Sequence, residues 1–142
     1  MITLFILLSN RIENNNGPGI KIGIANKAKI VKNTIKLNQD GIHVISADPH
    51  IFKNKIEKNY QNAIFISTHD DIRCDGLIEK NEISANKRNG IHVSGYNNYP
   101  RILGNTFIQY NKLAGIRVDN NAHCSIFRNS VSKNLGQVIF NK

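Results

Sequence analysis

The sequence has only two cysteines, Cys74 and Cys124, and neither lies in a C-x-x-C pair. Small disulfide-stabilised scaffolds need several cysteines, and the common zinc sites need closely spaced cysteine or histidine pairs. The cysteine content therefore predicts neither a disulfide framework nor a structural zinc site.

Long hydrophobic runs are also missing. The apolar opening segment, residues 2–8, is far shorter than the roughly 20 apolar residues that a membrane-spanning helix needs. No basic segment precedes it, and Ser9-Asn10-Arg11 follows it in place of a small-residue cleavage site. We expect no signal peptide, no membrane association, and a cytoplasmic or nuclear location.

Acidic residues are few, with 10 Asp and Glu against 19 Lys and Arg, which gives a net charge of +9. This excess favours anionic partners such as nucleic acid, acidic glycans, phosphate groups or acidic protein surfaces. An A/T-rich coding sequence would also enrich Lys, Asn and Ile, so charge alone identifies no partner. With 142 residues, 40% of them hydrophobic, the chain is the size of one folded domain.

One phrase recurs along the chain: Asn, any residue, an apolar residue, two more residues, Asn, a short turn, and Gly-Ile-x-Val. The clearest copies cover residues 33–44 and 81–93. The last segment begins at residues 19, 41, 63, 90 and 115, in steps of 22, 22, 27 and 25, and a further step of 22 reaches Gln137. Loops inserted around residues 69–75 and 95–100 explain the two long steps.

A period of 22 residues with apolar side chains at alternate positions, and no helical stripe, excludes helical repeats. The pattern predicts an all-β, single-stranded right-handed parallel β-helix with about 5–6 coils of about 22 residues. Residues 1–142 are expected to form a single β-helix domain. Both ends fall inside coils, so we expect a fragment of a longer solenoid with uncapped ends.

Parallel coils place equivalent residues about 4.8 Å apart, so the register predicts four apolar columns in the core. These columns are Ile20, Ile42, Ile64, Ile91 and Ile116; Ile22, Val44, Ile66, Val93 and Val118; Leu7, Ile30, Ile51, Ile78, Ile102 and Ile126; and Ile12, Ile35, Ile56, Ile83, Phe107 and Val131. Cys74 and Cys124 then lie two coils, or roughly 10 Å, apart, which predicts reduced thiols.

Asparagine recurs at two further positions of the coil. The first column is Asn10, Asn33, Asn54, Asn81, Asn105 and Asn129, and the second is Asn15, Asn38, Asn59, Asn86 and Asn134. Tyr110 and Asn111 straddle the missing position of the second column. Stacked amides bond to their neighbours, and Asn tolerates the left-handed conformation of a corner, so we interpret both columns as structural.

The repeat resembles the parallel β-helices of pectin-lyase-like proteins, of NosD-type periplasmic proteins and, most closely, of F-box-only proteins. The last resemblance rests on an alternation of two forms, Gly76-Leu-Ile-Glu-Lys-Asn-Glu-Ile83 followed by Pro100-Arg-Ile-Leu-Gly-Asn-Thr-Phe107. It covers nearly the whole chain. It implies a docking platform that presents proteins to a ubiquitin ligase, whose components would bind regions outside this chain, and it implies no catalytic motif and no cofactor.

The outward residue of each Gly-Ile-x-Val segment forms a predicted basic and aromatic stripe. Its members are Lys21, His43, Phe65, His92 and Arg117. Such a stripe could bind acidic peptides, or phosphates and nucleic-acid bases. A second basic row, Lys32, Lys53, Lys80 and Arg128, precedes the first asparagine column. In a lysine-rich protein, a solvated sheet face explains either set equally well.

Acidic residues gather near the first long loop. The register places Asp48 and Asp70 at equivalent positions of adjacent coils, with Asp71 beside them, where paired carboxylates could bind Ca²⁺ or act as general acids. The Asp48-Pro49-His50 triplet is also similar to a motif of alginate epimerases. Proline at this position is equally part of the F-box-type repeat, which would make Asp48 a turn residue. His43 and His92 lie two coils apart, so no histidine metal site is expected.

These patterns leave two main functions open. The lack of a convincing catalytic set favours a non-enzymatic interaction module with a protein partner. The alternative is a carbohydrate-active β-helix, a polysaccharide lyase, glycosidase or epimerase, that binds or cleaves acidic polysaccharide and for which alone Ca²⁺ is a candidate ligand. Nucleic-acid binding through charge is a third hypothesis.

Overall fold

The computed structural model describes residues 4–119, 121–136 and 138–140. These residues form three parallel sheets and no helix. Sheet A contains β1 (Leu4–Leu8), β4 (Lys27–Val31), β7 (His50–Phe52), β10 (Leu77–Glu79), β13 (Arg101–Leu103) and β16 (Ser125–Phe127). Sheet B contains β2 (Arg11–Glu13), β5 (Thr34–Lys36), β8 (Lys55–Glu57), β11 (Glu82–Ser84), β14 (Thr106–Gln109) and β17 (Val131–Ser132). Sheet C contains β3 (Ile20–Ile22), β6 (Ile42–Ile45), β9 (Ile64–Ser67), β12 (Ile91–Ser94), β15 (Ile116–Asp119) and β18 (Ile139–Phe140).

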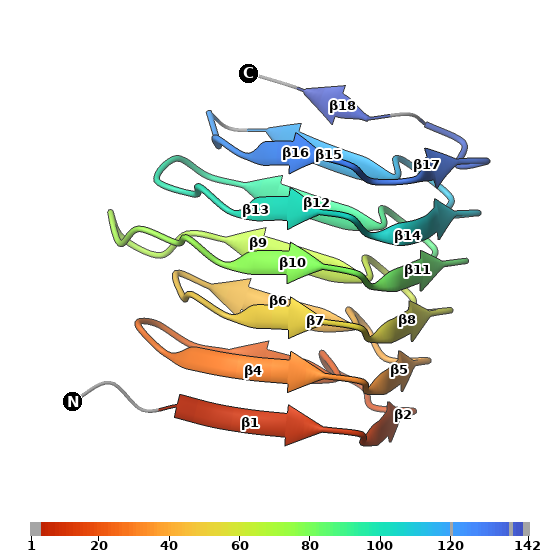
Figure 1. The fold of residues 1–142 in the computed structure, drawn as a ribbon, viewed down its shortest axis with the longest axis horizontal. Helices are drawn as coiled ribbons and strands as arrows, with labels where there is room; N and C mark the ends of the chain where they lie inside the picture. Colours follow the sequence, from red (N-terminus) through yellow and green to blue (C-terminus); the bar gives the residue numbers. More distant parts are fainter. Residues whose placement is uncertain (1–3, 120, 137, 141–142) are drawn as a thin grey trace.

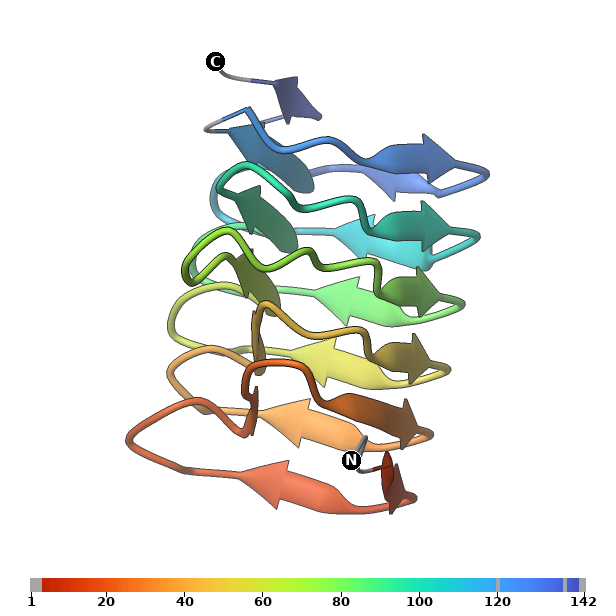
Figure 2. The same cartoon turned by 90° about the vertical axis from the view of Figure 1, so that its left-hand side faces the viewer.

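Each coil gives one strand to each sheet, and the coils stack in chain order from β1 to β18 (Figures 1 and 2). The path is right-handed, which confirms the predicted parallel β-helix. Successive ladder asparagines are separated by 21 to 27 residues, so coil length varies around the predicted period. Gln137, where the last repeat was expected to begin, lies outside the described residues. None of the described segments is a helix long and apolar enough to cross a membrane.

The core columns form as predicted in sheets A and C. Strand pairing aligns Ile30 with Ile51 and Ile42 with Ile64, and the same register continues through the middle coils. The isoleucine side chains of these coils are inaccessible to solvent. Burying such a side chain stabilises the fold by about 1.5–3 kcal/mol, so the stacked isoleucines supply most of the driving force for folding.

The prediction of Phe107 as a core residue is wrong. The pairing of β11 with β14 shifts register between Glu82 and Ser84, so that β14 carries one extra residue. Phe107 adopts a positive φ of 56° and is 55% exposed, whereas Ile108 is fully buried and pairs with Val131. A β-bulge of this kind turns one side chain to the opposite face, and here it exchanges Phe107 for Ile108 in the core.

Both asparagine columns form hydrogen-bonded ladders, as predicted. In the first, Asn81 Oδ1 accepts the Asn54 backbone N–H at 2.9 Å and the Asn54 side-chain amide at 3.0 Å. The Asn81 side-chain amide donates to the carbonyl of Ile51 at 2.9 Å. Asn111 fills the open position of the second ladder, because Asn86 donates to Asn111 Oδ1 and Tyr110 occupies the corner before it.

The loops that join sheet C to sheet A differ most between coils. The loop after β9 covers residues 68–76 and the loop after β12 covers residues 95–100, whereas the corresponding loop after β6 covers only residues 46–49. The first insertion therefore lies where the long repeat step predicted it, whereas the second long step combines the loop after β12 with the extra residue of β14. The loops after β9 and β12 project from one side of the solenoid, beside the first residues of β10 and β13 (Figure 1).

Candidate functional site

The predicted stripe of Lys21, His43, Phe65, His92 and Arg117 lies in register on the outer side of sheet C. The rings of His43 and Phe65 stack with centroids 4.8 Å apart, and those of Phe65 and His92 stack at 5.1 Å. Each ring therefore covers the face of its neighbour. The stack strengthens the solenoid and leaves mainly ring edges for a ligand.

Polar partners satisfy most of the stripe. His43 Nε2 lies 3.0 Å from the Ser67 hydroxyl, and burial lowers the pKa of His43. His92 Nε2 and Arg117 Nε lie 3.1 Å and 2.9 Å from the same carboxylate oxygen of Asp119.

Burial alone would raise the pKa of Asp119. Hydrogen bonds from His92, Ser94 and Arg117 outweigh burial and hold the Asp119 pKa below its ordinary value. The Asp119 carboxylate thus neutralises much of the positive charge predicted for this face. Of the five stripe residues, only Lys21 is exposed, and the other four are partly buried.

The predicted pairing of Asp48 with Asp70 is wrong. Strand pairing aligns His50 with Leu77, so the residue opposite Asp48 is Asp75, whose backbone N–H donates to Asp48 Oδ1 at 2.6 Å. Asp70 lies in the inserted part of the loop with a positive φ of 48°. Asp70 is one of the inserted residues between β9 and β10, and spacing alone does not show which residues of a long loop leave the ladder.

The remaining acidic residues of this loop contact other groups. The Asp70 carboxylate lies 3.4 Å from the His69 ring, and a hydrogen bond to the Asp71 carboxylate raises the pKa of the Tyr96 hydroxyl. Asp70 and Asp71 are both exposed. Among the described residues, no three Asp, Glu, His or Cys side chains come close enough to hold a metal ion together.

Both cysteines are free thiols, as predicted. Cys74 pairs with Asn98 of the next coil in an isolated β-bridge. Tyr99, which follows Asn98, stacks on His123 of the coil after that, and His123 directly precedes Cys124. The two cysteines therefore lie two coils apart. Burial raises the pKa of Cys74 and raises that of Cys124 to about 12. Neither thiol forms a reactive thiolate at neutral pH.

A different cluster lies on the outer face of sheet A, centred on His50. His50 Nε2 lies 2.9 Å from Glu79 Oε1, and both side chains are partly buried. Lys29 pairs with His50 on the preceding strand, and Arg101 is the equivalent residue two coils further on. We name these four residues, together with Asp48, the His50 face. Of its members, the sequence pattern indicated only Asp48 and His50, through the Asp-Pro-His triplet.

Aromatic and basic side chains border the His50 face on its loop side. The Arg73 guanidinium lies 4.2 Å from the centre of the Tyr99 ring, which in turn stacks on His123 with centroids 5.3 Å apart. Arg73 Nε is also held 2.6 Å from the Asp75 carboxylate. The long loop after β9 therefore places the Arg73 guanidinium at the edge of the His50 face, where Asp75 and Tyr99 hold it.

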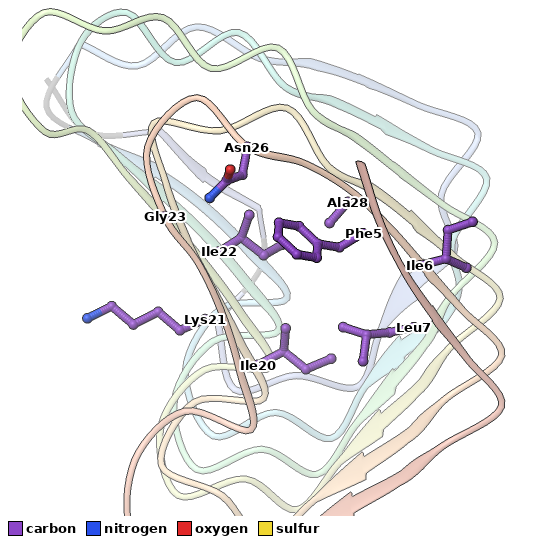
Figure 3. Close-up of a pocket in the computed structure, with 9 residues that line it drawn as sticks. All are labelled: Phe5, Ile6, Leu7, Ile20, Lys21, Ile22, Gly23, Asn26 and Ala28. Atoms are coloured by element: carbon purple, nitrogen blue, oxygen red, sulfur yellow. The ribbon is translucent and has the colours of Figure 1, made fainter. Parts of the chain in front are cut away.

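A mostly apolar hollow lies at the end formed by the first coil, away from these clusters. It measures about 430 Å³, and Phe5, Leu7, Ile20 and Ile22 are among its lining residues (Figure 3). The Phe5 ring points into the interior, while Lys21 points away from it (Figure 3). This hollow is the open cross-section of the core and contains no titratable group inside it.

A family model for the right-handed β-helix region matches residues 5–76 and 46–141. The chain belongs to this family. Its repeat is therefore that of a right-handed β-helix, as the columns and ladders require. No curated protein sequence matches the chain.

Among solved structures, this right-handed β-helix is similar to the crystal structure of the periplasmic alginate epimerase AlgG, with a TM-score of 0.65 and 16% sequence identity. The match covers 97% of this chain and 41% of that one. At this identity the likeness shows the fold alone. The resemblance to F-box-only proteins and the cytoplasmic or nuclear location stay predictions.

Proposed function

We propose that the chain binds an acidic polysaccharide on the His50 face and that His50 acts there as a general base on a uronate unit. The observation that carries this proposal is the 2.9 Å pair of His50 and Glu79, with cationic side chains in its column on either side. Removal of the proton beside a uronate carboxyl group needs both a base and a cation that neutralises the carboxylate.

His50 has the geometry of a positioned base. When Nε2 carries the hydrogen and donates it to Glu79, Nδ1 is left with a free lone pair. The Glu79 carboxylate fixes this tautomer and stabilises the imidazolium that forms after proton transfer. Asp48, exposed in the loop just before β7, supplies an acceptor for sugar hydroxyl groups.

The cations of the His50 face suit a polymer of carboxylates. Lys29 lies one coil before His50 and Arg101 two coils after it, so the charges are spread over roughly 15 Å along the solenoid. Arginine binds carboxylate through its planar fork, and the net charge of +9 attracts a polyanion from a distance. The alginate epimerase with a similar fold adds support for a carbohydrate ligand.

Titration calorimetry with alginate and with polygalacturonate tests the binding part. The substitution Arg101→Gln should weaken binding about fivefold for whichever of the two polymers the unaltered chain binds. This is the upper range for one exposed ion pair. Arg117→Gln is the matched control, because Arg117 lies on the outer face of sheet C and should not affect binding. Equal losses in both variants, or no binding of either polyuronate, would contradict the proposal.

The catalytic part needs a separate readout. Epimerisation is followed by proton NMR of the uronate and elimination by the ultraviolet absorbance of the unsaturated product. His50→Gln should abolish turnover while polyuronate is still bound, whereas His92→Gln, which breaks a similar histidine–carboxylate pair on sheet C, should leave turnover unchanged. Binding without turnover in the unaltered chain would leave a binding module and remove the general-base role.

A further inference from the structure

The corner between sheets A and B carries a row of cations that the fold does not require. Lys32, Lys53 and Lys80 occupy this corner in three successive coils, with positive φ values of 54°, 54° and 53°. Gly and Asn adopt this left-handed conformation readily, whereas other residues do so at a conformational cost. The corner between sheets B and C has the same conformation with Leu37, Lys58 and Ala85 in the corresponding coils. A continuous row of lysines is thus particular to one corner.

These lysines surround a cleft. With Asn54, Lys55 and Glu82 they line a hollow of about 430 Å³ beside β8. Four lysines and one glutamate, Glu82, line the hollow. The ammonium group of Lys55 also lies 3.5 Å from the carboxylate of Glu57. No carboxylate in the described part of the chain forms an ion pair with the three corner lysines.

Two of the corner lysines, Lys53 and Lys80, contact the same aromatic ring. The ammonium groups of Lys53 and Lys80 lie 4.9 Å and 5.6 Å from the centre of the same ring, that of Phe52. Two ammonium groups at one ring repel each other, and an anion bound between them would relieve this repulsion.

We propose that this cleft is a binding site for a tetrahedral oxyanion, the phosphate or sulfate group of an ester. Lysine is a compact point charge with three rotatable donors, which suits a tetrahedral oxyanion, whereas planar carboxylates are matched by arginine. A phosphate ester carries about −1.5 to −2 charges at neutral pH, enough to satisfy two or three ammonium groups. The site is separate from the His50 face and goes beyond the proposed uronate function.

Titrating the full chain with inorganic phosphate and with inorganic sulfate, followed by amide chemical shifts in NMR, tests the site. Shifts should be confined to residues 32, 53–55 and 80–82. Lys53→Asn should lower the affinity about fivefold, and Lys53→Asn combined with Lys80→Asn should remove saturable binding. Phosphate affinity should fall as the pH drops below the second pKa of inorganic phosphate, while sulfate affinity should not, which distinguishes the two anions.

Lys58→Asn is the matched control, because Lys58 has the same conformation and exposure at the other corner of the same coil. Both substitutions place Asn in the left-handed region and should raise Tm by roughly 2–4 °C. Only Lys53→Asn should weaken anion binding. Equal weakening by Lys58→Asn, or shifts scattered over all lysines, would overturn the proposal. The Arg101→Gln variant tests polyuronate binding, and the Lys53→Asn variant tests anion binding in the cleft. Failure of one proposal therefore leaves the other intact.

Discussion

At the scale of single residues, Asn81 shows why the ladders tolerate so little change. Its side-chain oxygen accepts two hydrogen bonds from Asn54, and its amide donates to Ile51 of the coil before and to Asn105 of the coil after. The residue is fully buried. One side chain therefore satisfies main-chain groups that no water molecule can reach.

Replacing Asn81→Ala should lower the free energy of unfolding by roughly 3–5 kcal/mol, because buried backbone groups lose their partners at about 1–3 kcal/mol each. Asn10→Ala, at the exposed end of the same ladder, should cost at most about 1 kcal/mol. Urea denaturation of both variants measures the difference. Similar losses at the two positions would show that the ladder contributes evenly and not through burial.

His43 should make stability depend on pH. Burial lowers its pKa below the ordinary value of 6.5, so the unfolded chain binds this proton more readily than the folded chain. The stability contributed by neutral His43 is therefore fully present above the unfolded pKa and falls as the pH decreases from there toward the folded pKa. His43→Phe keeps the stack on Phe65 and removes the titration, so denaturation at about pH 7.5 and about pH 5.5 should differ less in this variant than in the unaltered chain. An equal difference in both would assign the pH dependence to other groups.

At the scale of the element, β14 shows how a bulge changes the role of two neighbouring residues. Phe107 adopts a conformation that is unfavourable for an aromatic residue and is exposed, while Ile108 takes the core position. The neighbouring pairs of this sheet keep one residue opposite one residue, as β5 does with β8. The extra residue of β14 therefore disturbs the strand pairing only at β14.

Phe107→Asn should leave the fold intact and stabilise it by about 1 kcal/mol, because Asn tolerates the left-handed conformation that Phe does not. Ile108→Ala should destabilise it by about 3–4 kcal/mol through loss of buried surface and a residual cavity. Chemical denaturation of both variants tests the bulge. The opposite ranking would restore Phe107 to the core.

At the scale of the whole molecule, the solenoid is held together by contacts between adjacent coils. Every strand pairs only with the equivalent strands of its neighbours, as the three six-stranded sheets show. In such an arrangement stability is close to a sum of coil terms and interface terms. Middle coils have two interfaces, whereas the first described coil has one.

Equal substitutions should therefore differ with position. Ile56→Ala, in the middle of its column and fully buried, should cost about 3–4 kcal/mol. Ile12→Ala, at the partly buried end of the same column, should cost about 1 kcal/mol. Hydrogen exchange should show the same order, with the slowest amides in β8 and β11. Uniform exchange along the solenoid would contradict a sum of coil terms.

The spacing of asparagine and isoleucine predicted the fold, the ladders, nearly all of the core and the outward stripe, because each coil repeats the same environment at about 4.8 Å. The errors lie where a coil departs from the repeat. The extra residue of β14 and the insertion after β9 have no partner in adjacent coils, so periodicity does not locate Phe107 or Asp70. The pair of His50 and Glu79 joins strands 29 residues apart in the chain, and no local pattern marks it.

The sequence by itself determined that this chain is a parallel solenoid, since only stacked coils satisfy a 22-residue pattern of buried isoleucine and bonded asparagine. The tertiary structure decided which outward residues act together. Side chains on the surface are constrained by their neighbours in other coils. On sheet C, Asp119 pairs with His92 and Arg117 of the stripe, and on sheet A, His50 lies beside Glu79 of the next coil.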